Sequence, residues 1–435
     1  MRTLDFSIVC LLALAMPAVA ADKSRSPTVN DARIQQHITE LSKFGTNPEG
    51  GVSRVAFSDA DIQGREYVKK LMQEAGLVVR VDTAGNIIGR REGSNPKLSA
   101  ILIGSHTDSV PHGGNYDGDV GVMGAIEVAQ TLSERRVGLK HPLEVIDFAN
   151  EEGGTVGSLA MMGGLKPAAL DLMTHSGKTI RDGIRAIGGD PDRLAEAQRK
   201  PGDYAAYVEL HIEQGAILDE SDIDIGVVEG IVGIHWWDVT VQGVANHAGT
   251  TPMNRRHDAM LSAAEFVLAV NRVATSIPGR QVATVGRIRA EPGAPNVIPG
   301  KVVMSLEIRD LAAAKMAAVY DAVRAEAEKI AQARQTPISF KELETSSVPA
   351  PTDPRMQRII ANAAKSLNLT SKVMPSGAGH DAQEIAHIAP AGMIFVPSVG
   401  GVSHSPQEFT SQQDMANGAN VLLQTVLAID RGELR

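Results

Sequence analysis

Histidines and carboxylates occur in short segments that directly follow predicted strands. Residues 104–110 read Gly-Ser-His-Thr-Asp-Ser-Val, so His106 and Asp108 are two residues apart. Side chains at this spacing in extended chain point to the same side, and the carboxylate could orient an imidazole that ligates a metal ion. Asp117 follows in the glycine-rich residues 113–119, which are equally typical of an ordinary turn.

A pair of glutamates and two further histidines extend this set. Glu151 and Glu152 follow a second predicted strand, and adjacent carboxylates at a strand end point apart. One could then bind a metal ion while its neighbour acts as general base on water. His211 lies in an alternating strand, and His404 lies in a loop near the C-terminus. These residue types predict metal-dependent hydrolytic chemistry with oxygen and imidazole ligands.

The elements that must position these residues alternate between strand and helix. Helices are predicted over residues 61–75 and 120–132, and apolar strands over 100–104 and 143–148. Strand followed by helix, repeated, predicts an α/β domain whose mostly parallel sheet is covered on both faces. In such sheets ligand sites lie at the carboxyl ends of strands, where the residues above are found.

A smaller α+β domain is predicted as an insertion. Between residues 226 and 336 two alternating strands are flanked by long alanine-rich helices, which predicts a separate unit within the larger domain. The catalytic domain then comprises residues 21–225 and 337–435. The strands are expected near residues 282–288 and 302–308, and the helices over residues 258–273 and 312–333.

Length and charge narrow the class of function. A chain of 435 residues exceeds what one hydrophobic core usually organises, so two domains are expected. With 42 basic and 51 acidic residues the formal charge is -9, and neither a nucleic-acid partner nor an anionic membrane surface is indicated. Small-molecule chemistry fits this composition better.

Residues 1–20 have the pattern of a signal peptide. An apolar run over residues 8–16 precedes Ala18-Val19-Ala20, which predicts cleavage after Ala20 and export to the periplasm or the medium. An uncleaved membrane anchor is the alternative, although the run is short for a bilayer. The single cysteine, Cys10, lies in this segment, so the mature chain would contain no thiol.

Five motifs in order resemble a known family. Residues 106–118, 151–153, 211–215, 246–253 and 403–406 resemble the amidase branch of the M20 metallopeptidase family. This branch holds N-carbamoyl-L-amino-acid hydrolases, allantoate amidohydrolases and β-ureidopropionases. The resemblance extends over nearly the whole mature chain.

The resemblance implies two divalent ions per subunit, such as zinc, manganese, cobalt or nickel. Asp117 would bridge them, His106 and His211 would complete one ion, and Glu152 and His404 would complete the other. Glu151 would be the general base, taking a proton from the attacking water and passing it to the leaving nitrogen. Asp108 would hold His106 in its ligating tautomer.

The resemblance also implies a set of residues for a substrate that carries a carboxylate. His247 would reach the developing oxyanion, typically from the partner subunit of a homodimer. Arg309 would clamp the carboxylate with its planar fork, although a strand-end surface ion pair is the plain alternative. The inserted unit would be a lid or dimerisation domain, and domain closure on substrate would bring His247 over the metals. The further substrate-binding positions implied are Gln214, Asn296 and Gly379.

His211 favours a carbamoyl or ureido substrate over a peptide, because ordinary peptidases of this family usually carry an aspartate there. The expected products include ammonia and carbon dioxide. A dipeptide-cleaving metallopeptidase and a non-catalytic exported binding protein remain the alternatives. Many relatives follow the two glutamates with an Arg-Phe pair and a longer connection, whereas residues 153–158 here read Gly-Gly-Thr-Val-Gly-Ser. The particular substrate therefore stays open.

Overall fold

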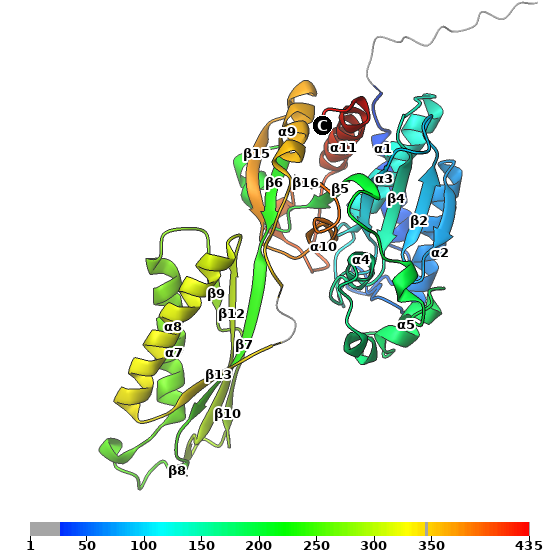
Figure 1. The fold of residues 1–435 in the computed structure, drawn as a ribbon. Helices are drawn as coiled ribbons and strands as arrows, with labels where there is room; N and C mark the ends of the chain where they lie inside the picture. Colours follow the sequence, from blue (N-terminus) through cyan, green and yellow to red (C-terminus); the bar gives the residue numbers. More distant parts are fainter. Residues whose placement is uncertain (1–26, 344–346, 435) are drawn as a thin grey trace, which may run out of the picture.

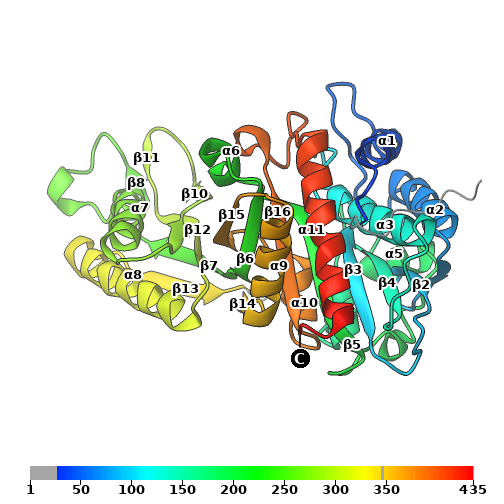
Figure 2. The same cartoon turned by 90° about the horizontal axis from the view of Figure 1, so that it is seen from above.

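The computed structural model describes residues 27–343 and 347–434, so the predicted signal peptide lies outside the described residues. The chain forms a large α/β unit and an elongated smaller unit that extends from it (Figure 1). Both are seen from above in Figure 2. Among the described residues, no helix combines the length and apolar character that a membrane span requires.

A nine-stranded mixed sheet is the frame of the large unit. Its four central strands, β4, β3, β5 and β16, run parallel to one another, while β2 and β6 continue the sheet with antiparallel pairing to β4 and β16. The predicted mostly parallel α/β domain is confirmed. In spatial order the strands are β1 (Val78–Val81), β2 (Ile87–Arg91), β4 (Leu143–Phe148), β3 (Ala100–His106), β5 (Tyr204–Ile212), β16 (Ala391–Val396), β6 (Ile225–Ile231) and β14 (Ala350–Pro351), with β15 (Ser371–Ser376) also paired to β6.

Helices cover both faces of this sheet, each over its own apolar cluster. The first face carries α1 (Asp31–Leu41), α2 (Asp59–Glu74), α3 (Asp119–Glu134), α9 (Pro354–Ser366) and α11 (Gln412–Arg431). The other face carries α4 (Val156–Met162), α6 (Ile217–Ser221) and α10 (Asp381–Ile385), and α5 (Ile180–Ala186) packs on a further cluster that includes α4 residues.

Two of the predicted helices show how local sequence sets their limits and burial. α2 begins two residues before the prediction because Ser58 caps it by accepting from the backbone N–H of Asp61. α3 is buried on nearly all sides because it contacts β3 and β5 as well as α1 and α11. Gly121 permits this close approach, since a Cβ there would lie 2.2 Å from the carbonyl oxygen of Leu210 in β5.

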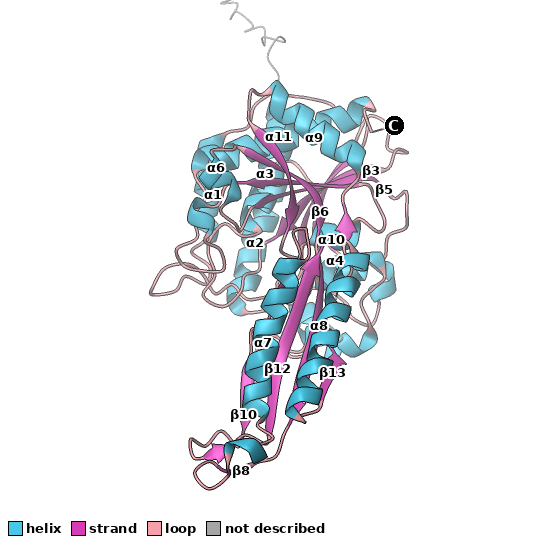
Figure 3. Cartoon of the chain, turned by 90° about the vertical axis from the view of Figure 1, so that its left-hand side faces the viewer, coloured by secondary structure: helices cyan, strands magenta, loops and turns pink. Residues whose placement is uncertain are grey.

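The smaller unit is a second sheet with two helices on one face (Figure 3). In β12 half-buried and buried residues alternate, and the buried ones pack under α7 and α8. The predicted strand over residues 282–288 is two short strands, which pair with different halves of β12. The elements are β7 (Gly233–Gln242), α7 (Ala259–Ser276), β9 (Val282–Thr284), β10 (Ile288–Glu291), β12 (Lys301–Asp310), α8 (Ala313–Arg334) and β13 (Ile338–Glu342).

Sheet membership shows where the chain passes between the two units. β6 pairs within the large sheet, and the chain enters the small sheet at Gly233, two residues after β6 ends. It leaves that sheet after β13, so the predicted limits at residues 226 and 336 fall within β6 and just before β13. A separate two-stranded ribbon, β8 (Asn246–His247) with β11 (Val297–Ile298), lies at the far end of the smaller unit in Figures 1 and 3.

Candidate active site

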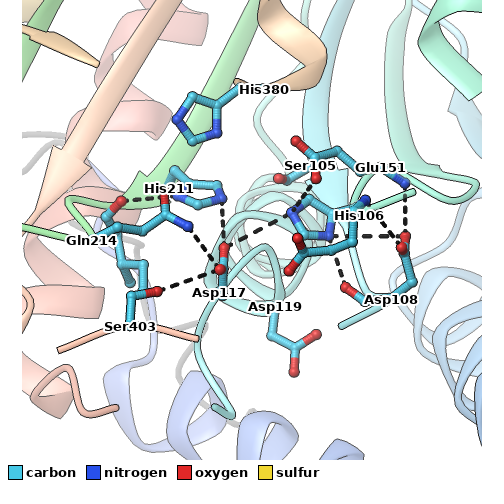
Figure 4. Close-up of polar contacts among 12 residues, drawn as sticks. Ser105, His106, Asp108, Asp117, Asp119, Glu151, His211, Gln214, His380 and Ser403 are labelled. Atoms are coloured by element: carbon cyan, nitrogen blue, oxygen red, sulfur yellow. Dashed lines mark hydrogen bonds and ion pairs between the residues drawn. The ribbon is translucent and has the colours of Figure 1, made fainter. Parts of the chain in front are cut away.

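The predicted site residues of the large unit lie together at the carboxyl ends of its parallel strands (Figure 4). His106 ends β3, the two glutamates follow β4, and His211 lies near the end of β5. Adjacent parallel strands end at the same edge of a sheet, so segments far apart in sequence meet there. Loops bring Asp117 and His404 to the same place.

Asp117 lies at the centre of this group. Its Oδ1 atom is 3.0 Å from Nε2 of His211 and 4.0 Å from Nε2 of His106. Its Oδ2 atom is 3.0 Å from Nε2 of His404, which is in turn 3.6 Å from Oε1 of Glu152. Each oxygen of one carboxylate therefore faces its own set of donors, and the ligand atoms of each set lie within 4.8 Å of one another.

Asp108 connects the segments that carry His106 and the glutamates. Nδ1 of His106 is 2.9 Å from the backbone carbonyl oxygen of Asp108, which leaves Nε2 to face Asp117. The prediction gave this orienting role to the Asp108 carboxylate, but its Oδ1 is 3.9 Å from the ring nitrogen, too far for a hydrogen bond. The carboxylate instead accepts from the backbone N–H groups of Glu151 and Glu152, at 3.0 and 3.2 Å.

Glu151 is buried and faces the same centre. Its Oε2 atom is 3.7 Å from Nε2 of His106. Burial and the neighbouring carboxylates, Asp381 and Glu152 foremost, raise the pKa of Glu151 well above its usual value. Burial and the charge of Asp117 likewise raise the pKa of Glu152 to about 8. Several carboxylates are thus crowded into one low-dielectric site.

The histidine rings differ in charge. Burial lowers the pKa of His106 to about 4, so its ring is neutral near pH 7. Burial acts in the same direction on His211, but contact with the Asp117 carboxylate outweighs it and raises the pKa to about 9. The hydrogen bond to Asp117 also raises the pKa of His404 to about 9. These two bonds outweigh burial at Asp117 and hold the pKa of its carboxyl well below the usual range.

The donor set fits divalent cations. Oε1 of Glu152 is a buried atom without a hydrogen-bond partner, and it belongs to one of the groups around Asp117. A buried polar atom without a partner is costly, and a cation between these donors would satisfy it and offset the crowded negative charge. Imidazole and carboxylate ligands suit zinc and its neighbours among the divalent metals.

Three residues beside the ligands have positive backbone φ although none is glycine. Asn150, Gln214 and His404 have φ values of 54°, 58° and 52°. Such conformations cost of the order of 1 kcal/mol and cluster at functional sites, where the surrounding structure enforces them. Just beyond Asn150, the short connection leads directly into α4, and a Cβ at Gly153 would lie 2.1 Å from Oδ1 of Asn150.

The glycine-rich stretch does more than make a turn. Gly118 has φ +67°, and a Cβ there would lie 2.5 Å from the His106 ring. A Cβ at Gly114 would lie 2.0 Å from Oε1 of Glu408. These two glycines therefore make room for side chains of the site itself.

Glu408 is a site residue that the sequence did not predict. Its carboxylate accepts from the backbone N–H groups of Tyr116 and Asp117, at 2.9 and 3.0 Å, and from the hydroxyl of Ser403 at 2.8 Å. It therefore ties the Asp117 loop to the loop that carries His404. The sequence signal that could have identified Glu408 is its position as an acidic residue four positions after His404.

A second unpredicted group lies behind His211. The His380 ring packs edge-on against that of His211, with centroids 4.4 Å apart, and its Nε2 is 2.8 Å from the hydroxyl of Ser376. Buried Glu209 accepts from the hydroxyl of Ser105 at 2.7 Å and from the backbone N–H of Ala382 at 2.9 Å. The contacts of His380 with His211 and of Glu209 with Ser105 are not readable from sequence spacing, because each joins distant segments.

The predicted substrate-binding residues divide among three places. Gln214 lies in the site, where its Nε2 donates to Oδ2 of Asp117 at 2.8 Å. Arg309 lies at the junction of the two units, pairs with Glu307 at 2.8 Å and donates to the carbonyl oxygen of Gly377 at 2.7 Å. Gly379 follows two residues later in the same loop.

His247 and Asn296 are not brought to this chain's own site. His247 lies in the ribbon at the far end of the smaller unit, and Asn296 directly precedes β11 of that ribbon. The backbone N–H of Ala248 donates to the carbonyl oxygen of Asn296 at 3.0 Å. The His247 side chain is exposed, and its Nδ1 accepts from the backbone N–H groups of Gly249 and Thr250.

Comparison with known proteins agrees with this architecture. Residues 102–428 match the model of peptidase family M20/M25/M40. The chain is 42% identical over 410 residues to an N-carbamoyl-L-amino acid amidohydrolase of Geobacillus stearothermophilus, covering 93% of this chain and all of the relative. It is 39% identical to a ureidoglycolate hydrolase of Arabidopsis thaliana, covering 92% and 87% of the two chains.

A solved structure of a hydantoinase/carbamoylase family amidase from Burkholderia multivorans matches with a TM-score of 0.84 at 35% identity, over 93% and 98% of the two chains. The chain therefore belongs to peptidase family M20/M25/M40. The predicted membership of its amidase branch and the predicted hydrolase class are confirmed.

Metal binding should release protons near pH 7. His211 and His404, with pKa values of about 9, carry protons in the metal-free chain, and a ring nitrogen must lose its proton to ligate. We expect about two protons from these rings per chain at saturation, with a further contribution from Glu152. Because the raised pKa values keep the rings protonated, apparent affinity should fall as pH drops below about 9.

Calorimetric titration in buffers of different ionisation enthalpy measures this release. His404→Ala serves as the control, because it should reduce the release by about one proton. Binding without proton release would contradict the assignment of these rings as ligands.

Proposed function

We propose that this protein is a metal-dependent amidohydrolase that cleaves the ureido C–N bond of a small N-carbamoyl amino acid or related ureido acid. The observation that carries the proposal is the position of Asp117, whose two oxygens face separate donor sets beside the buried carboxyl of Glu151. Relatives named N-carbamoyl-L-amino acid amidohydrolase and ureidoglycolate hydrolase support the substrate class.

The two donor sets would hold two divalent ions. His106 and His211 would complete the coordination on the Oδ1 side of Asp117, and Glu152 and His404 would complete it on the Oδ2 side. A pair of ions held in this way would lower the pKa of water and polarise the carbonyl under attack. Zinc, manganese, cobalt and nickel all suit these ligands.

Glu151 carries the proton during hydrolysis. Its carboxylate takes a proton from the water that attacks the ureido carbon, and returns it to the leaving nitrogen. The C–N bond breaks as the amine leaves, and the carbamic acid released breaks down to ammonia and carbon dioxide. Asp108 holds Glu151 in place through the hydrogen bond that its carboxylate accepts from the Glu151 backbone N–H.

Arg309 provides selectivity for a substrate carboxylate. It lies at the junction of the two units, and its planar fork matches a carboxylate in two hydrogen bonds. Both of its terminal nitrogens already have partners in Glu307 and the Gly377 carbonyl. A substrate carboxylate must therefore replace one of these contacts, and this exchange would couple substrate binding to movement of the smaller unit.

A homodimer would complete the site. His247 lies in a ribbon remote from this chain's metal ligands, so His247 of the partner subunit would supply the oxyanion donor. The smaller unit offers a surface for such pairing, because Leu261 and Leu268, seven residues apart on α7, are 42% and 67% exposed. Export, proposed from the sequence of residues 1–20, would place this activity outside the cytoplasm.

An activity panel on metal-reconstituted protein tests the proposed reaction. We expect turnover of N-carbamoyl-L-amino acids or small ureido acids such as allantoate and ureidoglycolate, with release of ammonia, and little turnover of dipeptides. Glu151→Gln should lower kcat by about 100-fold or more because it removes the proton carrier, while metal content stays unchanged.

Two results would count against this proposal. Efficient dipeptide hydrolysis without ureido hydrolysis would favour a peptidase of the same fold. Near-normal turnover by metal-loaded Glu151→Gln would remove Glu151 from the mechanism.

Mixed dimers test whether the partner subunit completes the site. Glu151→Gln and His247→Ala should each be nearly inactive alone, because one lacks the base and the other lacks the oxyanion donor. After the two variants are mixed and subunits exchange, half of the dimers are mixed and each has one intact site. Activity should therefore recover to roughly a quarter of wild type.

A mixture of Glu151→Gln with Glu151→Ala is the matched control and should recover nothing. Subunit exchange is verified by mass spectrometry of differently tagged chains. If the exchanged His247→Ala mixture stays inactive, His247 does not act across the dimer.

A further inference from the structure

We infer that Arg54, a residue outside the metal ligands and the general base, is the positioning residue that sets the distance between the His106 and Asp117 segments. Its side chain is 1% exposed although it is charged. A buried guanidinium requires partners for its N–H groups. The partners of Arg54 indicate its positioning role. The inference rests on the proposed metal site.

The Arg54 guanidinium binds both ligand segments at once. Its Nε donates to the carbonyl oxygen of Thr107 at 2.7 Å, one residue after His106. Its Nη2 donates to Oδ2 of Asp119 at 2.5 Å, two residues after Asp117. One rigid planar group therefore spans the residues that follow two of the ligands, and Nε2 of His106 lies 4.0 Å from Oδ1 of Asp117.

Arg54 is itself held in place by the surrounding backbone. Nη1 donates to the carbonyl oxygens of Leu41 and Phe44, at the end of α1. The backbone N–H of Arg54 donates to the hydroxyl of Ser109 at 3.0 Å, and its carbonyl oxygen accepts from the Ser109 backbone N–H at 3.0 Å. These contacts fix the guanidinium relative to the segment after β3, so the position of Asp119 follows from that of Arg54.

The packing around Arg54 leaves space for this side chain. Gly64, in α2, lies against its stem, and a Cβ there would be 2.8 Å from Cδ of Arg54. Lysine cannot replace arginine here, because one ammonium cannot reach the carbonyls and the carboxylate in the same fork geometry. Arg54→Lys should therefore disturb the site, while its ammonium group keeps a positive charge beside the buried carboxylate of Asp119.

A zinc titration of the full mature chain tests the inference. We expect Arg54→Lys to weaken zinc affinity by 10-fold or more, measured by competition with a chromophoric chelator well below the unfolding temperature. At saturating zinc, kcat should recover to within about threefold of wild type with KM unchanged, because the ligands and the base remain. If Arg54→Met folds, it should lose more zinc affinity than Arg54→Lys. If Arg54→Met does not fold, the zinc affinity of Arg54→Lys alone tests the positioning role.

Arg33→Met is the matched control. Arg33 also pairs with a buried acid of α3, Glu127 at 2.6 Å, but on the part of the helix away from Asp117. It should lower Tm and leave zinc affinity within about twofold of wild type. If Arg54→Lys lowers Tm as Arg33→Met does and leaves zinc affinity unchanged, Arg54 has only a structural role.

The same titration separates this inference from the proposed function. Zinc binding without ureido turnover by the wild-type chain would overturn the proposed substrate class, while the Arg54 result would stand on affinity alone. A wild-type chain that binds no zinc would overturn both.

Discussion

The sharing of one carboxylate between two sets of donors is the constraint on which the rest of the site depends. Asp117 can serve both sets only if its two oxygens face His211 and His404, each 3.0 Å away. Those histidines come from β5 and from a loop near the C-terminus, so the parallel sheet must bring distant segments to one edge. Glu408 then fixes the backbone at Asp117 itself, and the glycines of that loop leave room for it.

The sequence predicted that the proposed ligands lie together because their positions follow from topology. His106 and His211 lie at strand ends that must meet in a parallel sheet, and the motifs around Asp117 and His404 resemble one family. The predicted target of the Asp108 carboxylate was wrong because it depends on how the turn at Asn150 presents two backbone N–H groups. Glu408 and Arg54 were missed because their partners are backbone atoms of remote loops, which no spacing rule reveals.

The fold also separates residues that the sequence grouped by motif. Gln214 lies beside Asp117 and Arg309 lies at the junction of the two units. His247 and the neighbouring Asn296 instead lie at the ribbon at the far end of the smaller unit. An elongated inserted domain can carry such a ribbon to a neighbouring copy of the chain. The same domain would then serve substrate closure in one subunit and completion of the site in the other. The exposed apolar side chains of α7 fit such a pairing.

Metal content after zinc reconstitution and desalting tests the shared carboxylate most directly, in wild type, His404→Ala and Asp117→Asn. The account predicts about two zinc ions per chain in wild type, about one in His404→Ala, and almost none in Asp117→Asn, because only Asp117 contributes to both sets. Circular dichroism would confirm that each variant is folded. An Asp117→Asn chain that retains one or two tightly bound ions would contradict the account.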